Sequence, residues 1–258
     1  MSKTRIVLSF DDGRADNLRA VKEIITPCGL KATMNITTNF VEDTIPSDVR
    51  PCPNVSMDRV DVAELASFAN IEIAGHGTNH QNTLEDLGEG VKTLRRWLPD
   101  TPIVGIASPN SKLLEEDIIK DQAAYEALGL SYVRIGPGNS YSGLHRIFGK
   151  LARMTGSSWF YTHSVAGALI TGKPGFCLLS VPVMKPHRLQ QVQALVRSAV
   201  QKDADLILMF HSILKPDEDH YADDWTWDYE DFNNLCQWLS NQGDIEVVTT
   251  AELVSAGK

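Results

Sequence analysis

Cysteine, long hydrophobic runs and basic charge are all scarce in this sequence of 258 residues. Its four cysteines stand far apart and form no Cys-x-x-Cys pair, so they neither build a zinc knuckle nor suggest a disulfide framework. Free thiols in a reducing compartment are the simplest interpretation. No apolar run approaches the roughly 20 residues that span a bilayer, so no transmembrane segment is expected. The chain leads from Met1 almost directly into a predicted strand, without room for a secretion signal. A cytoplasmic protein is therefore the expectation.

The charge balance is acidic, with a formal net charge of -9 and an isoelectric point near 5.2. This argues against general binding to nucleic acid or to an anionic membrane, because both need a strongly basic surface. Acidic residues are nevertheless absent from Ala127 through Lys202, so an acidic protein has a basic middle. We interpret this segment as a solvated basic face or as a subunit contact in a homo-oligomer.

The length and the 43% hydrophobic content suit one large core, and we expect a single domain over residues 1–258. Runs of strand length alternate with helix-like spacing, which predicts a parallel sheet covered by helices, closed as a barrel or open and doubly wound. Two segments, Val41 to Ser56 and Gly136 to Gly175, break this alternation and are predicted to be long loops. The predicted strands are Arg5 to Phe10, Ala32 to Thr37, Ile71 to Ala74, Ile103 to Ala107, Tyr132 to Ile135, Phe176 to Leu179, Leu206 to Phe210 and Ile245 to Val248. The predicted helices are Ala15 to Ile25, Val60 to Phe68, Leu84 to Leu98, Leu113 to Leu128, Leu189 to Val200 and Tyr229 to Leu239.

Polar side chains follow three of the predicted strands at the point where each strand ends. Asp11 and Asp12 follow the first strand, His76 and His80 follow the third, and His211 follows the apolar run that ends at Phe210. Active sites of parallel α/β proteins are assembled at the carboxyl ends of strands, so these side chains are expected to converge. Two imidazoles and one carboxylate would leave coordination positions open, as a catalytic metal site requires, while the second carboxylate stays available to move a proton.

Each motif alone has a plainer interpretation. Asp-Asp-Gly after a strand is an ordinary turn or helix cap, a His-x-x-x-His pair is frequent by chance, and a histidine after an apolar run is often a hydrogen-bonded core residue. The spacing of His76 and His80 brings two imidazoles together if the residues between them form one helical turn. Polar side chains at three equivalent strand ends are hard to explain by packing, since each buried polar group would need its own hydrogen-bond partners to offset the cost of burial.

At these residues the chain resembles the polysaccharide deacetylase family, the NodB-homology group of carbohydrate esterases. The family motif TFDDG is similar to Ser9-Phe10-Asp11-Asp12-Gly13, and its H-[ST]-x-x-H motif resembles His76-Gly77-Thr78-Asn79-His80, with Gly77 in place of Ser or Thr. Further similarity is seen at the family's late leucine and histidine motif, its "IKATFF" strand and its terminal Thr-x-x-Glu-Leu ending, which correspond here to Leu208 through Ile213, Leu30 to Met34, and Ile245 to Leu253.

The resemblance implies an incomplete or distorted (β/α) barrel that binds one divalent cation, often zinc, at Asp12, His76 and His80. Asp11 would be the catalytic base and His211 the acid that protonates the departing amine. The family's Arg-x-Pro motif, which orients the base, has only Ala107-Ser108-Pro109 here, so Lys112 or Arg134 is expected to supply the missing guanidinium or ammonium.

The family's acidic partner of the catalytic histidine is also missing, unless it comes from the loop that holds Asp217, Glu218, Asp219, Asp223 and Asp224. Pro109 and Trp227 are expected to contact substrate. Trp225, Trp227 and Tyr229 follow His211 closely and are candidates for stacking on a sugar ring, with a hydrophobic anchor for the final helix as an equal alternative. If the basic middle borders the site, the substrate is anionic, such as a phosphorylated or uronic sugar.

The function predicted from these residues is metal-dependent hydrolysis of an amide bond outside peptides, with removal of acetyl from an N-acetylated sugar or oligosaccharide as the first expectation. One alternative is a relative that hydrolyses another linear or cyclic amide or a formamide. Another is a degenerate protein that binds metal or carbohydrate without turnover, which Asp11 argues against. An Fe(II) oxygenase fits the ligand count but not the alternation of strand and helix.

Overall fold

The computed structural model describes residues 3–44, 55–111, 113–137 and 143–255. Its strands are β1 (Thr4–Phe10), β2 (Ala32–Ile36), β3 (Ile71–Gly75), β4 (Gly105–Ala107), β5 (Tyr132–Ile135), β6 (Ile170–Thr171), β7 (Cys177–Leu179), β8 (Val181–Pro182), β9 (Ala204–Phe210), β10 (Ser212–Leu214), β11 (Thr226–Asp228) and β12 (Ile245–Val247). Its α-helices are α1 (Ala15–Ala20), α2 (Thr38–Val41), α3 (Arg59–Ser67), α4 (Leu84–Trp97), α5 (Glu115–Lys120), α6 (Gln122–Ala127), α7 (Gly143–Thr155), α8 (Ser158–Ser164), α9 (Leu189–Gln201), α10 (Tyr229–Ser240) and α11 (Thr250–Ser255). A π-helix, η1 (Val21–Ile25), continues α1, and short 3-10 turns lie at η3 (Pro109–Ser111) and η5 (Ala166–Ala168). None of the described helices is long and apolar enough to cross a bilayer.

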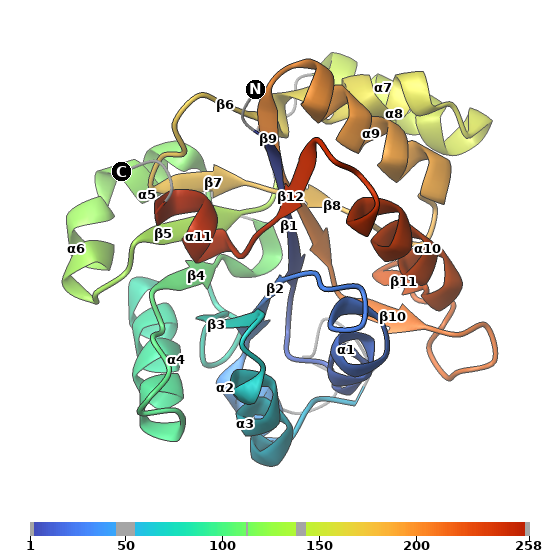
Figure 1. Ribbon diagram of the computed structural model, residues 1–258. Helices are drawn as coiled ribbons and strands as arrows, with labels where there is room; N and C mark the ends of the chain where they lie inside the picture. The colour runs from blue at the N-terminus through green and yellow to red at the C-terminus, as the bar shows by residue number, and fades with distance from the viewer. Residues whose placement is uncertain (1–2, 45–54, 112, 138–142, 256–258) are drawn as a thin grey trace.

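The parallel strands form a nearly closed ring, which confirms the expected distorted (β/α) barrel. β1 to β5 lie in chain order, and β9 pairs with the other edge of β1. The ring closes through the segment 177–182, because β7 pairs with β5 while β8, after the single residue Ser180, pairs with β9. Figure 1 shows the helices arranged around these strands, with α11 lying in front of the ring.

Alternation within each strand separates the outer core from the barrel interior. In β1 the side chains of Ile6, Leu8 and Phe10 pack in the large hydrophobic cluster beneath the surrounding helices. Val7 belongs to a second, smaller cluster with residues of β5, β9 and α11, which fills the interior. Since successive side chains point to opposite faces, Asp11 continues the inward row when the strand ends. The strand period therefore places this carboxylate inside the barrel mouth.

The amino end of the barrel is closed by α11 and a buried hydrogen-bonded network. The Glu72 carboxylate on β3 accepts hydrogen bonds from the Thr33 hydroxyl at 2.8 Å, the Tyr132 hydroxyl at 2.8 Å and the Ala251 backbone N–H at 3.0 Å. Gly105 makes room for this arrangement, because a Cβ there would lie 1.9 Å from the Tyr132 ring. Substrate access is thus left to the opposite, carboxyl end.

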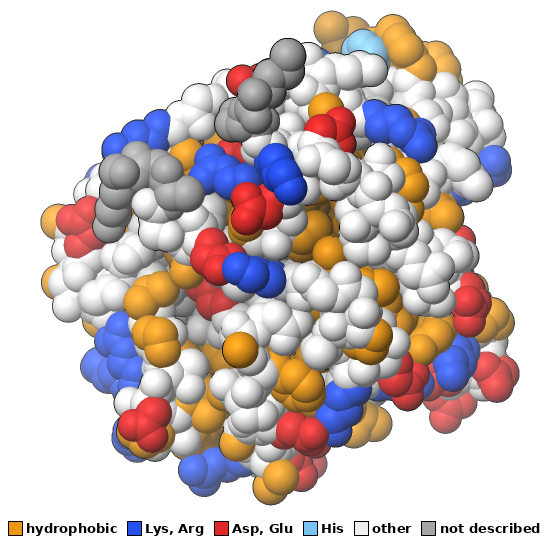
Figure 2. Space-filling view, in the orientation of Figure 1, with side chains coloured by type: hydrophobic (Ala, Val, Ile, Leu, Met, Phe, Trp, Pro, Cys, Tyr) orange, Lys and Arg blue, Asp and Glu red, His pale blue; other side chains and the backbone are white. Residues whose placement is uncertain are grey.

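Most predicted elements are present, but two expectations need correction. The segment predicted as a loop from Gly136 to Gly175 contains α7, α8 and the short strand β6. Its glycines suggested a loop, although Leu144, Ile147, Phe148 and Leu151 recur at helical spacing. Hydrophobic side chains gather at the surface over these two helices in Figure 2.

The helix predicted from Leu113 to Leu128 is divided into α5 and α6, because the chain turns at Asp121. Much of the other predicted loop, Val41 to Ser56, lies outside the described residues.

Candidate metal and catalytic site

The strand ends that carry the three motifs line one cavity at the carboxyl end of the barrel. It has a volume of about 160 Å³ and is lined by side chains from the ends of β1, β3, β4 and β9 and from the loop before β11. The lining residues are Asp11, Arg14, His76, His80, Ser108, Asn110, Met209, His211 and Trp225. The three motifs of the sequence therefore meet at one place, as expected from the strand order.

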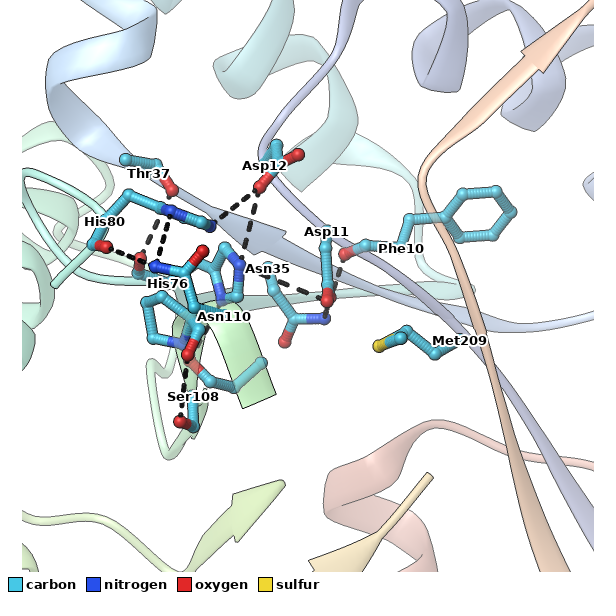
Figure 3. Close-up of polar contacts among 12 residues, drawn as sticks. Phe10, Asp11, Asp12, Asn35, Thr37, His76, His80, Ser108, Asn110 and Met209 are labelled. Carbon is cyan, nitrogen blue, oxygen red and sulfur yellow. Dashed lines mark hydrogen bonds and ion pairs between the residues drawn. The ribbon is translucent and has the colours of Figure 1, made fainter. Parts of the chain in front are cut away.

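Asp12, His76 and His80 form the candidate metal site. Their ligand atoms all lie within 4.8 Å of one another. Asp12 Oδ1 is 3.5 Å from His76 Nε2 and 3.3 Å from His80 Nε2, and it accepts no conventional hydrogen bond although it is buried. Figure 3 shows the two imidazoles directed at this oxygen. A buried carboxylate oxygen left bare between two imidazole nitrogens fits a divalent cation, and one oxygen with two nitrogens is a donor set that zinc accepts.

Each imidazole is oriented by a contact behind it. The Nδ1 atom of His76 lies 2.9 Å from the carbonyl oxygen of Ala107, so the Nε2 atom is left to face the cavity. The Nδ1 atom of His80 lies 3.3 Å from the Asn110 side-chain nitrogen, which is also 3.2 Å from the His80 carbonyl oxygen. Asn110 has a φ of 57°, and its left-handed backbone directs the amide to His80. Contacts of this kind fix which nitrogen of a histidine serves as ligand.

The loop between the two histidines is not the helical turn expected from their spacing. Gly77 and His80 have φ values of 82° and 58°, which no α-helix contains. The Asp86 carboxylate in the first turn of α4 instead holds the loop, accepting hydrogen bonds from the backbone N–H groups of Thr78, Asn79 and Gln81. The imidazoles meet, with ring centroids 4.9 Å apart, because this carboxylate folds the loop.

We predict that Gly77→Ser, at the position where the similar motif has Ser or Thr, weakens binding of added zinc to the Asp12, His76 and His80 cluster at least tenfold and lowers the melting temperature. A Cβ at this position would lie 2.5 Å from Asp86 Oδ2, so the carboxylate that holds the loop would have to shift. Gly29→Ser is the matched control, since Gly29 also has a positive φ of 66° but nothing within 4 Å of its added Cβ. Zinc titration against a chelator and thermal unfolding measure both effects. Equal changes of zinc affinity and melting temperature in the two variants would contradict a role of Asp86 in holding the loop.

Asp11 is held by a buried arginine of β5, Arg134. Arg134 Nη2 on β5 donates to Asp11 Oδ1 at 2.6 Å and Oδ2 at 2.7 Å, and the Asn35 amide donates to Oδ1 at 2.9 Å. Burial favours a higher pKa for Asp11, but the charge of Arg134 together with those of His76 and His211 outweighs burial and holds the pKa below its ordinary value. The carboxylate is therefore ionised at neutral pH. Of the two cations expected here, Arg134 fills the position, whereas Lys112 lies outside the described residues.

Asp12 is bound by a second buried arginine, Arg14. Its Nε and Nη2 donate to Asp12 Oδ2 at 3.2 and 2.8 Å, and its Nη1 donates to the Ser212 hydroxyl at 2.8 Å. Burial again favours a higher pKa for Asp12, yet Arg14 and the two imidazoles hold it well below the usual range. Each of the two adjacent carboxylates thus has its own guanidinium.

His211 lacks the acidic partner that the sequence left open. Its Nδ1 is buried without a hydrogen-bond partner among the described residues, and Glu218 and Asp223 of the later loop bind Arg19 and the Trp225 N–H instead. The Trp225 ring covers the imidazole with centroids 4.5 Å apart. Burial lowers the pKa of His211 to about 4, so the imidazole is neutral at pH 7.

The two expected substrate contacts, Trp227 and Pro109, do not line the cavity. Trp227 is 2% exposed, packs against Phe210 and Phe232, and donates its indole N–H to the His187 carbonyl oxygen at 2.8 Å. Trp227 is therefore the hydrophobic anchor named as the alternative, and the prediction that it stacks on a sugar ring was wrong. Trp225 lines the cavity instead. Pro109 is buried between its neighbours Ser108 and Asn110, which do line it.

Among the described residues of the basic middle, Arg134 reaches the site. Arg134 binds Asp11, whereas Arg146 and Lys150 lie on α7 and are not among the cavity-lining residues of the described chain. Direct recognition of an anionic substrate by α7 is therefore not part of this geometry.

The first turn of α1 fixes the backbone around His211. Asp16 accepts from the Ile213 N–H at 2.7 Å, and the Asn17 amide donates to the His211 carbonyl oxygen at 2.7 Å. Burial raises the pKa of Asp16 to about 6, despite these hydrogen bonds and the nearby Arg14. Ionised Asp16 is thus less favourable in the folded chain than in the unfolded one.

The stability of the protein should therefore depend on pH through Asp16. Because its folded pKa of about 6 lies above the ordinary 3.8, the folded state holds the proton more tightly, and this contribution to the free energy of unfolding falls as pH rises from about 4 to about 6. The change for this group is about 3 kcal/mol. The difference between wild type and Asp16→Asn in urea unfolding at pH 4 and pH 7 measures it. A difference that does not vary with pH would contradict the assignment.

Several site residues were missed by reasoning from the sequence. Asn35 could have been found, since it and Thr33 are polar at alternate positions of an otherwise apolar strand and so share the inward face with Asp11. Arg14 directly follows the Asp-Asp-Gly motif and carried only the signal of a charge beside it. Asn110 lies in a loop, where no hydrophobic period marks it. Trp225 was not missed, since it was among the aromatic residues expected near a sugar ring, and it lines the cavity.

Comparison with known proteins agrees with this description. Residues 1–127 match the family model for polysaccharide deacetylase. No curated protein matches the chain. Among solved structures, a presumed polysaccharide deacetylase from Mycobacterium smegmatis has a TM-score of 0.57 at 10% identity, over 100% of this chain and 91% of that one. A 4-alpha-glucanotransferase from Thermococcus litoralis has a TM-score of 0.55 at 9% identity. That superposition covers 99% of this chain but only 40% of the glucanotransferase chain. At such identities the structures show the shared fold, while the family match supports a hydrolase of the deacetylase kind.

Proposed function

We propose that this chain, which resembles the polysaccharide deacetylases over residues 1–127, is a metal-dependent hydrolase that removes acetyl from the nitrogen of an N-acetylated sugar or oligosaccharide. The observation that carries the proposal is the pairing of the Asp12, His76 and His80 cluster with a second, separately held carboxylate, Asp11. A divalent ion held by that cluster, zinc in our proposal, would act as a Lewis acid that lowers the pKa of water and polarises an amide carbonyl. Metal binding alone needs no carboxylate beside the ligands.

Asp11 is the general base in this proposal. It is 2% exposed, and Arg134 keeps it ionised and fixes its plane, so it is ready to remove a proton from water at neutral pH. His76 Nε2 lies 4.0 Å from Asp11 Oδ2, which places the base beside the cluster without joining it. Hydrolysis then moves one water proton to Asp11 and onward to the amine nitrogen as the C–N bond breaks.

His211 serves this reaction as a neutral group. The sequence predicted an acid that is protonated at the start, but the pKa of about 4 means that the imidazole carries no extra proton at pH 7. In our proposal it donates a hydrogen bond toward the departing amine, and Trp225 excludes water on its other side.

The cavity volume limits which part of the substrate enters. About 160 Å³ is smaller than the roughly 300–1,000 Å³ of pockets that enclose whole drug-sized ligands. The acylated amine therefore enters, while the remainder of a sugar or oligosaccharide lies outside. A cytoplasmic location and a soluble substrate stay predictions.

The test is to incubate the zinc-loaded protein with a panel of N-acetylated and N-formylated sugars and with linear and cyclic amides, and to assay the acid or amine released. Release of acetate from an N-acetyl sugar by the wild type, and its loss in Asp11→Asn, is the expected result. Retention of zinc with no turnover of any compound would favour a binding protein and overturn the proposal. Turnover confined to formamides or cyclic amides would reassign the substrate.

A further inference from the structure

Arg14 treats the two oxygens of Asp12 differently. Its Nε and Nη2 both donate to Oδ2, whereas Oδ1, which faces His76 and His80, accepts no hydrogen bond from the described residues. The guanidinium is 2% exposed and is fixed at its far side by the Ser212 hydroxyl. One oxygen of the candidate ligand is thus occupied by a cation of the protein, and the other is left bare.

This arrangement affects a metal ion in two ways. A guanidinium on Oδ2 prevents that oxygen from joining Oδ1 as a second ligand from the same carboxylate, which would fill a coordination position needed by the reactants. Its positive charge, held in a buried setting close to the site, also repels a divalent cation and lowers the affinity for it. A carboxylate without this partner would bind the ion more tightly and with both oxygens.

We propose that Arg14 is a positioning residue that makes Asp12 a one-oxygen ligand, weakening metal affinity in exchange for open coordination positions. The catalytic value of those open positions rests on the proposed function, whereas the effect of Arg14 on metal affinity does not. Arg134 has a different role, since its Nη2 donates to both carboxylate oxygens of Asp11.

The experiment compares zinc affinity with catalysis in Arg14 variants. Zinc dissociation constants are measured by competition with a chelator for wild type, Arg14→Gln, Arg14→Met and Arg14→Lys, and kcat is measured at saturating zinc. We expect zinc to bind at least tenfold tighter in the Gln and Met variants while kcat falls at least tenfold. Arg14→Lys, which keeps the charge, should bind zinc within threefold of wild type.

A merely structural role would give a different pattern. Arg95→Gln is the control, because Arg95 also donates two hydrogen bonds, to the Leu128 and Ile103 carbonyl oxygens, but lies away from the cavity. It should lower the melting temperature without changing zinc affinity. Zinc binding that is weaker or unchanged in both Arg14→Gln and Arg14→Met, with the proteins folded by circular dichroism, would overturn the proposal. Because zinc affinity is measured without substrate, this outcome is distinct from a failure to find deacetylation.

Discussion

Asp11→Asn is expected to lower kcat by about 10²–10⁴-fold, the range that a positioned general base contributes. The amide keeps the size of the side chain and one acceptor oxygen for Arg134, but it cannot take a proton from water. Zinc affinity should change little, since Asp12, His76 and His80 remain. Steady-state kinetics and chelator competition on the same preparation separate the two quantities.

Asp12→Asn is the comparison for that variant, because it alters the neighbouring carboxylate. It should weaken zinc binding at least tenfold, since an amide oxygen is a poorer ligand than a carboxylate. If Asp11→Asn lost zinc to the same extent as Asp12→Asn, then Asp11 would be a ligand and the division of labour between the two aspartates would be wrong.

Arg134→Gln is expected to lower the free energy of unfolding by about 3–5 kcal/mol, the usual cost of leaving one member of a buried ion pair alone. Arg134 and Asp11 are 1% and 2% exposed, so water cannot replace the lost guanidinium. Without that cation the pKa of Asp11 rises, because burial is then opposed by fewer positive charges. Urea unfolding measures the first effect, and the acidic limb of the pH–rate profile measures the second.

The double variant Asp11→Asn with Arg134→Gln tests the cause. If the single variant is unstable because a charge is stranded, removing that charge should restore part of the stability, and the two changes should not add. Additive losses would instead indicate that Arg134 stabilises the fold by packing alone.

The residues that the sequence predicted best are those governed by a regular period. β5 was predicted at its observed bounds, and the bounds of α3 and α4 lie within one residue of the predicted ranges Val60 to Phe68 and Leu84 to Leu98. The convergence of Asp11, Asp12, His76 and His80 followed from one rule, that parallel strands end at the same side of a sheet.

The residues predicted worst depend on contacts between distant segments. Trp225 and Trp227 are two positions apart, but Trp227 lies in β11 and is buried in the core, whereas Trp225 lies before the strand and lines the cavity. The loop from His76 to His80 depends on Asp86, whose role has no signature at the spacing of the histidines. Arg134 could be named as a candidate by its charge, but its reach to Asp11 required the ring to close.

The order in which the strands pair bears on how the protein is made. β1 pairs with strands on both of its edges. Its residue Ile6 pairs with Leu206 of β9 and with Val247 of β12, which are translated long after it. Contacts between residues so far apart form slowly, because a long loop must first be closed. The hydrophobic strands β1 and β2 are therefore exposed on the nascent chain until β9 and β12 have been synthesised. We expect expression of this protein to depend on chaperones that shield these strands during synthesis.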